Sequence, residues 1–125
     1  MKILIDNGHG SNTPGKCSPD GRLKEYAYAR EIATRLEAEL RKQGVDAERI
    51  VKEEIDVPLS ERCRRVNEYK ASDTILVSIH CNAAGKWFCN GCRRAVGKHG
   101  LRQVRRKPTD WLIVYMQRPD SFCRI

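Results

Sequence analysis

The sequence predicts an α/β fold in which a largely parallel sheet is flanked by helices. Over the first 85 residues, apolar runs alternate with segments whose apolar residues recur at three- and four-residue spacing. The resulting order strand, helix, strand, helix, strand is typical of parallel sheets with helical crossovers. The length of 125 residues suits one domain. A composition of 40% hydrophobic and 32% charged residues indicates a globular chain and excludes a disordered or membrane-spanning one.

The first predicted strand spans residues 2–6, an apolar run closed by Asn7, Gly8, His9 and Gly10. An apolar run bounded by glycine favours a buried strand that enters a tight loop. Residues 11–21 contain two Pro and two Gly together with Ser, Asn and Asp. This composition predicts a longer loop.

A long helix is expected next. Its apolar residues recur at three- and four-residue spacing with charges between them: Leu23, Tyr26, Ala29, Ala33, Leu36 and Leu40. Gly44 stands where a helix C-cap belongs. The pattern predicts about five turns.

Three further elements complete the pattern. Residues 45–51 mix apolar and charged side chains and predict a second strand. Residues 56–61 begin another helix with Pro near its first turn. Its expected apolar stripe is Leu59, Cys63 and Val66, with Tyr69 as a further candidate. Residues 74–79 are β-branched and nearly all apolar, which predicts a strand covered on both faces.

Three candidate metal ligands come from separate junctions of this pattern. His9 follows the first strand, Glu25 opens the long helix and His80 closes the third strand. Ligands bind at the carboxyl ends of parallel strands, so we expect the three side chains at one edge. Two His, one carboxylate and a water form an open catalytic zinc set, and Gly8 and Gly10 suit a backbone that bends closely around a ligand. The alternatives are ordinary loop histidines and a Glu that favours the helix dipole.

Four blocks stand in order along the chain: ILIDNGHG at 3–10, LKEYAYAR at 23–30, PLSER at 58–62 and VSIHCNAA at 77–84. In order and spacing they resemble the zinc-dependent N-acetylmuramoyl-L-alanine amidases of bacterial autolysins and phage endolysins. The resemblance covers about residues 1–85. It implies an amidase-like three-layer sandwich, of which this chain holds the N-terminal half only.

The resemblance also implies a set of roles. His9, Glu25 and His80 bind Zn²⁺, and Asn82 lies beside the site as a substrate-binding residue. The family cleaves the amide between N-acetylmuramic acid and L-alanine in peptidoglycan, using zinc-activated water and a general-base Glu from the last strand. Arg62 falls on a recurrent family position, which implies substrate binding, whereas an Arg on an amphipathic helix is more often a structural ion pair.

Residues 86–125 differ from the rest in charge. The first 85 residues hold 14 basic and 14 acidic side chains, whereas the tail holds 10 basic residues, two Asp and no Glu. No Glu occurs after Glu68, so the general base of the family has no candidate at its usual place. We therefore interpret residues 1–85 as the N-terminal part of an amidase catalytic domain and residues 86–125 as a basic tail that does not match. The expected result is an impaired hydrolase.

The genetic code suggests an origin for the tail. Back-translated and shifted by one base, residues 108–125 can encode DRLADRLYAEAGQLLPD, which resembles a helix that the family carries after its third strand. We interpret the tail as out-of-frame sequence that begins close to Gly85. Such a segment is not expected to pack regularly against the first 85 residues.

Other interpretations of the tail stay open. A small zinc site would use Cys89, Cys92, His99 and Cys123. The basic residues with Trp87 and Trp111 would suit nucleic acid or an anionic polymer, and residues 109–116 would suit an added strand. The alternative functions are therefore a non-catalytic zinc- or wall-binding remnant, or a basic nucleic-acid-binding protein. The four blocks favour the amidase.

Location is predicted from the first residues. They lack the basic start, apolar core and small-residue cleavage site of a secretory signal, so the chain as written is expected in the cytoplasm. After release, the site of action would be the cell wall. We expect peptidoglycan as the partner, no membrane and no nucleic acid, and the sequence does not indicate an oligomeric state.

Overall fold

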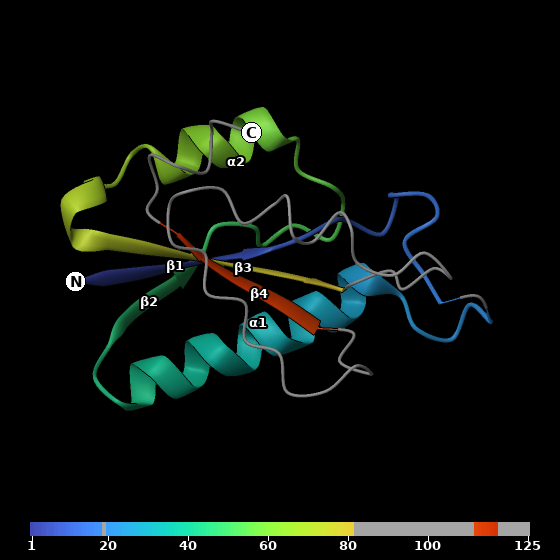
Figure 1. The fold of residues 1–125 in the computed structure, drawn as a ribbon, viewed down its shortest axis with the longest axis horizontal. Helices are drawn as coiled ribbons and strands as arrows, with labels where there is room; N and C mark the ends of the chain where they lie inside the picture. The colour runs from blue at the N-terminus through green and yellow to red at the C-terminus, as the bar shows by residue number, and fades with distance from the viewer. Residues whose placement is uncertain (19, 82–111, 118–125) are drawn as a thin grey trace, which may run out of the picture.

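The structure is a computed structural model that describes residues 1–18 and 20–81 and the backbone of residues 112–117. In chain order these residues form β1 (Lys2–Asn7), α1 (Glu25–Lys42), β2 (Asp46–Arg49), α2 (Leu59–Val66), a 3₁₀ turn (Ala71–Asp73), β3 (Thr74–Cys81) and β4 (Leu112–Gln117) (Figure 1). The predicted order strand, helix, strand, helix, strand is confirmed, and β4 follows it.

The sheet has the strand order β2-β1-β3-β4. β1 is central to its parallel part and pairs in parallel with β2 and β3, so that Lys2 lies opposite both Asp46 and Thr74. β4 runs antiparallel to β3 at the other edge. Because β1 and β3 are parallel and in register, the chain leaves both strands at the same edge of the sheet, where ligands bind in such folds.

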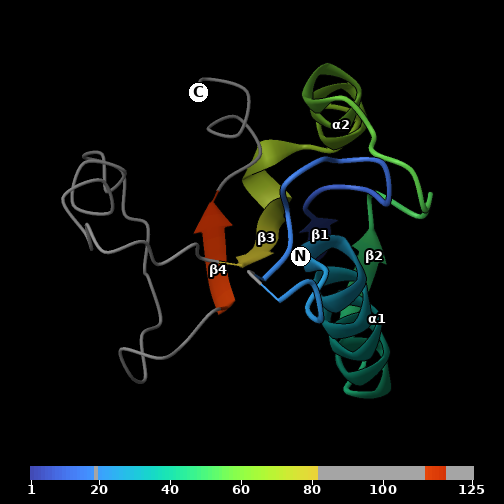
Figure 2. The ribbon, with the colours of Figure 1, turned by 90° about the vertical axis from the view of Figure 1, so that its right-hand side faces the viewer.

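One helix covers each face of the sheet, as Figures 1 and 2 show. Alternate side chains of β1 point to opposite faces, so Ile5 and Leu4 belong to different core clusters. The cluster under α1 consists of Ile5, Ala29, Ala33, Val77 and Ile79. The cluster on the α2 face consists of Leu4, Ile50, Val51, Val57, Val66 and Leu76. The α/β prediction of a largely parallel sheet flanked by helices is therefore confirmed.

α1 has the length that its pattern predicts. Its 18 residues make about five turns, and Ala29 and Ala33 are fully buried against the sheet. Gly44 has a φ of +78°, and its N–H donates to the carbonyl of Arg41 at 3.0 Å. This left-handed residue ends the helix, because glycine adopts it without steric cost.

α2 buries a different stripe from the predicted one. Pro58 precedes the helix as expected, and Val66 is fully buried. Leu59, predicted to be in the stripe, is 48% exposed, and the buried residue of this turn is Arg62. The prediction for Leu59 is wrong because buried charges and carbonyls beneath the helix bind a guanidinium, which a hydropathy pattern does not register.

β4 corrects the expectation for part of the tail. Its six residues pair continuously with Leu76–Cys81 of β3, from Leu112 opposite Cys81 to Gln117 opposite Leu76. This stretch therefore forms regular structure, contrary to the expectation for out-of-frame sequence, and the alternative of an added strand is confirmed. Its high β propensity accounts for the pairing. The proposed cysteine site and the tail carboxylates Asp110 and Asp120 lie outside the described residues.

Candidate metal centre

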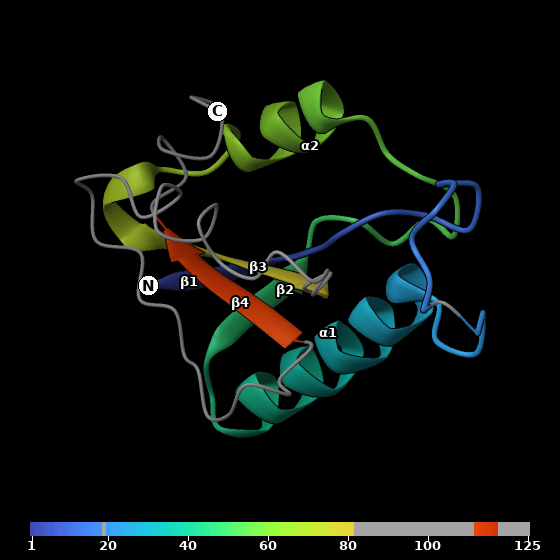
Figure 3. The same cartoon turned by 45° about the vertical axis from the view of Figure 1, so that its right-hand side comes forward.

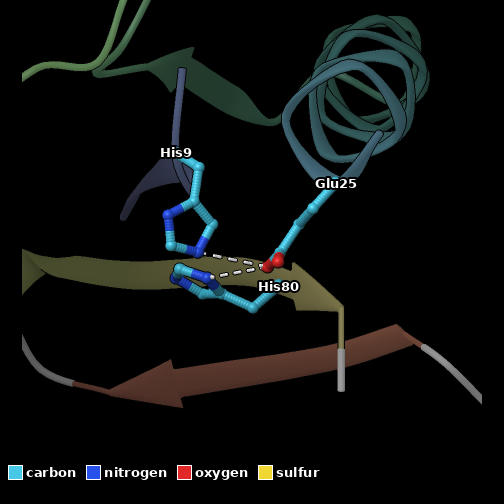
Figure 4. Close-up of side chains that lie close together, drawn as sticks. All are labelled: His9, Glu25 and His80. Carbon is cyan, nitrogen blue, oxygen red and sulfur yellow. Dashed lines mark ion pairs between the residues drawn. The ribbon is translucent and has the colours of Figure 1, made fainter. Parts of the chain in front are cut away.

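The structure brings His9, Glu25 and His80 together beyond the carboxyl ends of β1 and β3 (Figure 4). His9 stands two residues after β1, Glu25 is the first residue of α1, and His80 lies one residue before the end of β3. Their side chains point toward one another from three separate elements. Only the folded sheet places them side by side.

The distances among these side chains suit a shared ion. Glu25 Oε1 lies 3.3 Å from His9 Nε2 and 3.5 Å from His80 Nδ1. One ligand atom from each residue lies within 4.8 Å of the others. Ligands at ~2.1 Å from a tetrahedral ion are separated by ~3.4 Å from one another. The three donors therefore need little movement to surround one metal ion.

The chemistry of the donors fits zinc. Imidazole nitrogens and a carboxylate oxygen are zinc ligands, and three protein ligands leave a fourth position for water or substrate. Neutral imidazole is the form that binds a metal. Burial lowers the pKa of His9, although the charge of Glu25 acts in the opposite direction. The lowered pKa favours the ligand form of His9 at neutral pH.

Gly8 makes room for the His80 imidazole. A Cβ on Gly8 would lie 2.1 Å from His80 Cε1 and 2.3 Å from Nδ1, so a side chain at this position would displace the ring. The Gly8 N–H donates to the carbonyl of Ile79 at 3.1 Å, which ties the loop to β3. The predicted close approach at Gly8 thus exists, but its partner is the side chain of a candidate ligand.

Glu25 is fixed by backbone contacts. Its Oε1 accepts a hydrogen bond from the Cys81 N–H at 3.0 Å, and its own N–H donates to the carbonyl of Lys16 at 2.9 Å. Burial, together with the charge of Glu25, raises the pKa of the Cys81 thiol to about 11, so this thiol is protonated at neutral pH. Glu25 also benefits from the helix dipole, which is compatible with a role as ligand.

His9 lies in a tight loop and has an unusual backbone conformation. Its φ is +63°, in the left-handed region that residues with a side chain rarely adopt. The Gly10 N–H donates to Thr13 Oγ1 at 3.0 Å, and a Cβ on Gly10 would lie 1.9 Å from the Asp56 nitrogen. Gly10 therefore accommodates the neighbouring backbone of Asp56, and its closeness to a bound ligand stays a prediction.

A buried ion pair lies on the α2 side of the same strands. Arg62 contacts Asp6 Oδ1 at 3.3 Å and Asp56 Oδ1 at 3.4 Å, and its Nε donates to the carbonyl of Val57 at 2.8 Å. The Ser78 hydroxyl donates to Asp6 Oδ2 at 2.8 Å. These contacts are those of a structural ion pair, the alternative that the sequence left open for Arg62. Its role in substrate binding stays a prediction.

The other predicted substrate residue, Asn82, lies outside the described residues. Sequence reasoning gave no role to Asp6 or Arg30. Asp6 follows the apolar run of β1, and a buried carboxylate needs a partner. Nothing in the sequence pairs it with Arg62, which stands 56 residues away.

The fold and the site together define a class: an α/β protein with an open two-His, one-carboxylate metal site, as in many metal-dependent hydrolases. The profile of the N-acetylmuramoyl-L-alanine amidase family matches residues 3–109. The chain belongs to this family. The match includes all three candidate ligands and extends beyond Gly85, where the resemblance was expected to end. No curated protein matches the chain.

Membership of the family implies peptidoglycan as the substrate and a dependence on zinc. Of the helices that the structure describes, neither α1 nor α2 combines the length and apolar character that a membrane crossing requires.

Proposed function

We propose that the protein hydrolyses the amide between N-acetylmuramic acid and L-alanine in peptidoglycan, with zinc held by His9, Glu25 and His80. One observation carries the proposal: three zinc-type donors from separate elements converge at the carboxyl edge in a chain of the amidase family. Peptidoglycan is then the macromolecular partner, and the cell wall is the proposed place of action.

The metal would supply the chemistry of the site, and backbone contacts support two of its ligands. A zinc ion at this site supplies a Lewis acid for the amide carbonyl and lowers the pKa of a bound water to ~7. Glu25 is oriented by the Cys81 N–H, and His80 lies against Gly8. The side chains of His9 and His80 remain 19% and 29% exposed, so a substrate reaches the donors from solvent.

Proton transfer is the weak point of the proposed reaction. The leaving amine needs a proton, and a positioned acid or base contributes ~10²- to 10⁴-fold. Glu25 is a ligand in this proposal, and Asp6 is already paired with Arg62 and Ser78. No Glu follows Glu68 in the sequence. We therefore expect hydrolysis at least ~10²-fold slower than in a relative that supplies the Glu.

Arg62 and Asn82, the two predicted substrate-binding residues, are also part of the proposal. Arg62 holds Asp6 and the carbonyl of Val57, and a contact of Arg62 with the substrate is part of the proposal. Asn82 follows β3 directly and is proposed to contact the substrate beside His80.

Zinc binding tests the metal assignment. The 125-residue chain, stripped of metal and titrated with Zn²⁺, is expected to bind one equivalent at the three residues. His80→Ala should remove this binding, because two ligands remain. His99→Ala is the matched control, since His99 is the remaining histidine of the chain and lies in the alternative cysteine site. Loss of zinc in H99A with retention in H80A would contradict the proposal.

Hydrolysis tests the reaction. Two proteins are compared for the release of L-alanine N-termini from purified peptidoglycan. One is the 125-residue chain, and the other is a chain translated in the restored reading frame after Gly85, which carries a Glu in its last strand. The frame-restored chain should be at least ~10²-fold faster and should lose activity when zinc is removed. Equal rates would contradict the expected impairment. No release by either chain would contradict the proposed function.

A further inference from the structure

Arg30 connects the backbone of His9 to two other segments. It lies on α1, one turn beyond the start of the helix at Glu25. Its Nη1 donates to the carbonyl of His9 at 2.8 Å and to that of Tyr26 at 3.2 Å. Its Nε and Nη2 donate to the carbonyl of Glu53 at 3.1 and 2.7 Å. Only the planar fork of an arginine offers this many donors in fixed directions.

The loop that carries His9 needs such a support. A residue with a side chain keeps a φ of +63° only when its surroundings determine it. The loop is also in contact with the segment between β2 and α2, since the Ser11 N–H donates to the carbonyl of Glu54 at 2.9 Å. Figure 3 shows these two segments side by side beyond the N-terminal end of α1. Arg30 binds both of them through His9 and Glu53.

We infer that Arg30 is a positioning residue for the metal centre, which holds the His9 backbone so that its imidazole faces Glu25. The inference rests on the proposed function. α1 then supports two of the three ligands, because it carries Glu25 itself and fixes His9 through the guanidinium of Arg30. Without Arg30, the His9 backbone is free to leave the left-handed region, and its ring moves away while Glu25 and His80 stay.

Cobalt binding to the full chain tests this role, with Co²⁺ as the probe. The affinity and the visible spectrum at saturation are measured for the wild type, Arg30→Met, Arg30→Lys and Arg35→Met. R35M is the matched control, because Arg35 lies on the same helix, is exposed and pairs with Glu31. The urea unfolding of each metal-free variant reports its stability separately.

R30M is expected to bind Co²⁺ at least tenfold more weakly, the usual size of effect when a group that orients a metal ligand is lost. Its spectrum should also change, because the coordination geometry changes. R30K should lie between R30M and the wild type, since an ammonium cannot satisfy two carbonyls as a fork does. R35M should match the wild type.

Wild-type affinity and spectrum in R30M would overturn the inference, whatever its unfolding free energy. An equal loss in R35M would also overturn it, because the effect would then belong to the helix in general. If R30M does not fold, R30K decides: wild-type affinity in folded R30K overturns the role. Absence of Co²⁺ and Zn²⁺ binding by the wild type would contradict the proposed function itself.

Discussion

The two faces of the sheet are held by different interactions. Under α1 the core contains Ala29 and Ala33, whose small side chains let the helix lie close to the strands. On the α2 face the cluster consists of Leu, Ile and Val side chains, of which Leu4 and Leu76 are fully buried. That face also contains the buried pair of Asp6 and Arg62. Small side chains bring α1 close to the sheet, and α1 also has polar contacts, such as the pair of Glu37 with Arg49 at 2.6 Å. On the α2 face the buried ion pair reaches Asp6 in the central strand β1.

This difference matches what each helix does for the site. α1 carries Glu25 and Arg30, so its position relative to the sheet determines the metal centre directly. α2 acts on the segment before it: Arg65 donates to the carbonyl of Ile50 at 2.7 Å and pairs with Glu53 at 2.6 Å. Changes on the α1 face should therefore alter metal binding. Changes on the α2 face should mainly alter stability.

The largest effect is expected when the ion pair of the α2 face is broken. Arg62→Met leaves the carboxylate of Asp6, which is 1% exposed, without its cation. The free energy of unfolding should fall by about 3–5 kcal/mol, because an uncompensated buried charge is costly. Urea unfolding at pH 7 measures the change. The double variant D6N/R62M should recover part of the loss, and a loss below about 1 kcal/mol in R62M would show that the pair is dispensable.

A cavity on the α2 face comes next. Leu76→Ala should cost about 2–5 kcal/mol of unfolding free energy, because Leu76 is fully buried. Leu59→Ala on the same face is the control and should cost far less, since Leu59 is half exposed. Folded L76A should keep its zinc affinity. A loss of affinity in the folded variant would contradict the separation between the two faces.

Overpacking the α1 face should lower both the free energy of unfolding and the zinc affinity. Ala33→Leu places a larger side chain between helix and sheet and should cost about 1–3 kcal/mol. Because the displaced helix carries Glu25, zinc affinity should fall as well. Ala38→Leu on the exposed side of α1 is the matched control. Unfolding and zinc titration are measured on both variants. An unchanged zinc affinity in A33L would show that the position of α1 does not determine zinc binding.

The smallest effect is a pH dependence on the α2 side. The hydrogen bond from Arg65 lowers the pKa of Glu53 from 4.5 to about 2. Because the folded pKa is the lower one, the stabilisation is present above pH ~4.5 and is lost as the pH falls toward 2. Glu53 is 40% exposed, so solvent screening limits the contribution to less than about 1 kcal/mol. The free energies of unfolding at pH 6 and pH 3 should differ less in Glu53→Gln than in the wild type. An equal difference in both proteins would contradict the stabilising role of ionised Glu53.

The parallel part of the fold could be predicted from the sequence because its signals are local. The apolar run of β1, the spacing from Tyr26 to Leu40 and the glycine at 44 each depend on neighbouring residues, and each predicted element is present. The three ligands followed from topology, since parallel strands end at one edge. These inferences needed no knowledge of distant contacts.

What the sequence could not reveal depends on pairs far apart in the chain. The burial of Arg62 requires Asp6, and the hydrogen bonds of Arg30 require the carbonyls of His9 and Glu53. Carbonyl partners leave no trace in side-chain patterns. The pairing of β4 was only an alternative, because the favoured interpretation of the tail came from its composition, whereas a strand needs only β propensity and an open edge.

Zinc K-edge X-ray absorption on the zinc-loaded 125-residue chain tests the metal centre most directly. His9, Glu25 and His80 should give nitrogen and oxygen neighbours at ~2.0–2.2 Å, with the signature of two imidazoles. His80→Ala should remove the bound zinc and this signal. Sulfur neighbours at ~2.3 Å would show that cysteines hold the zinc, and would contradict the site at the carboxyl edge of the sheet.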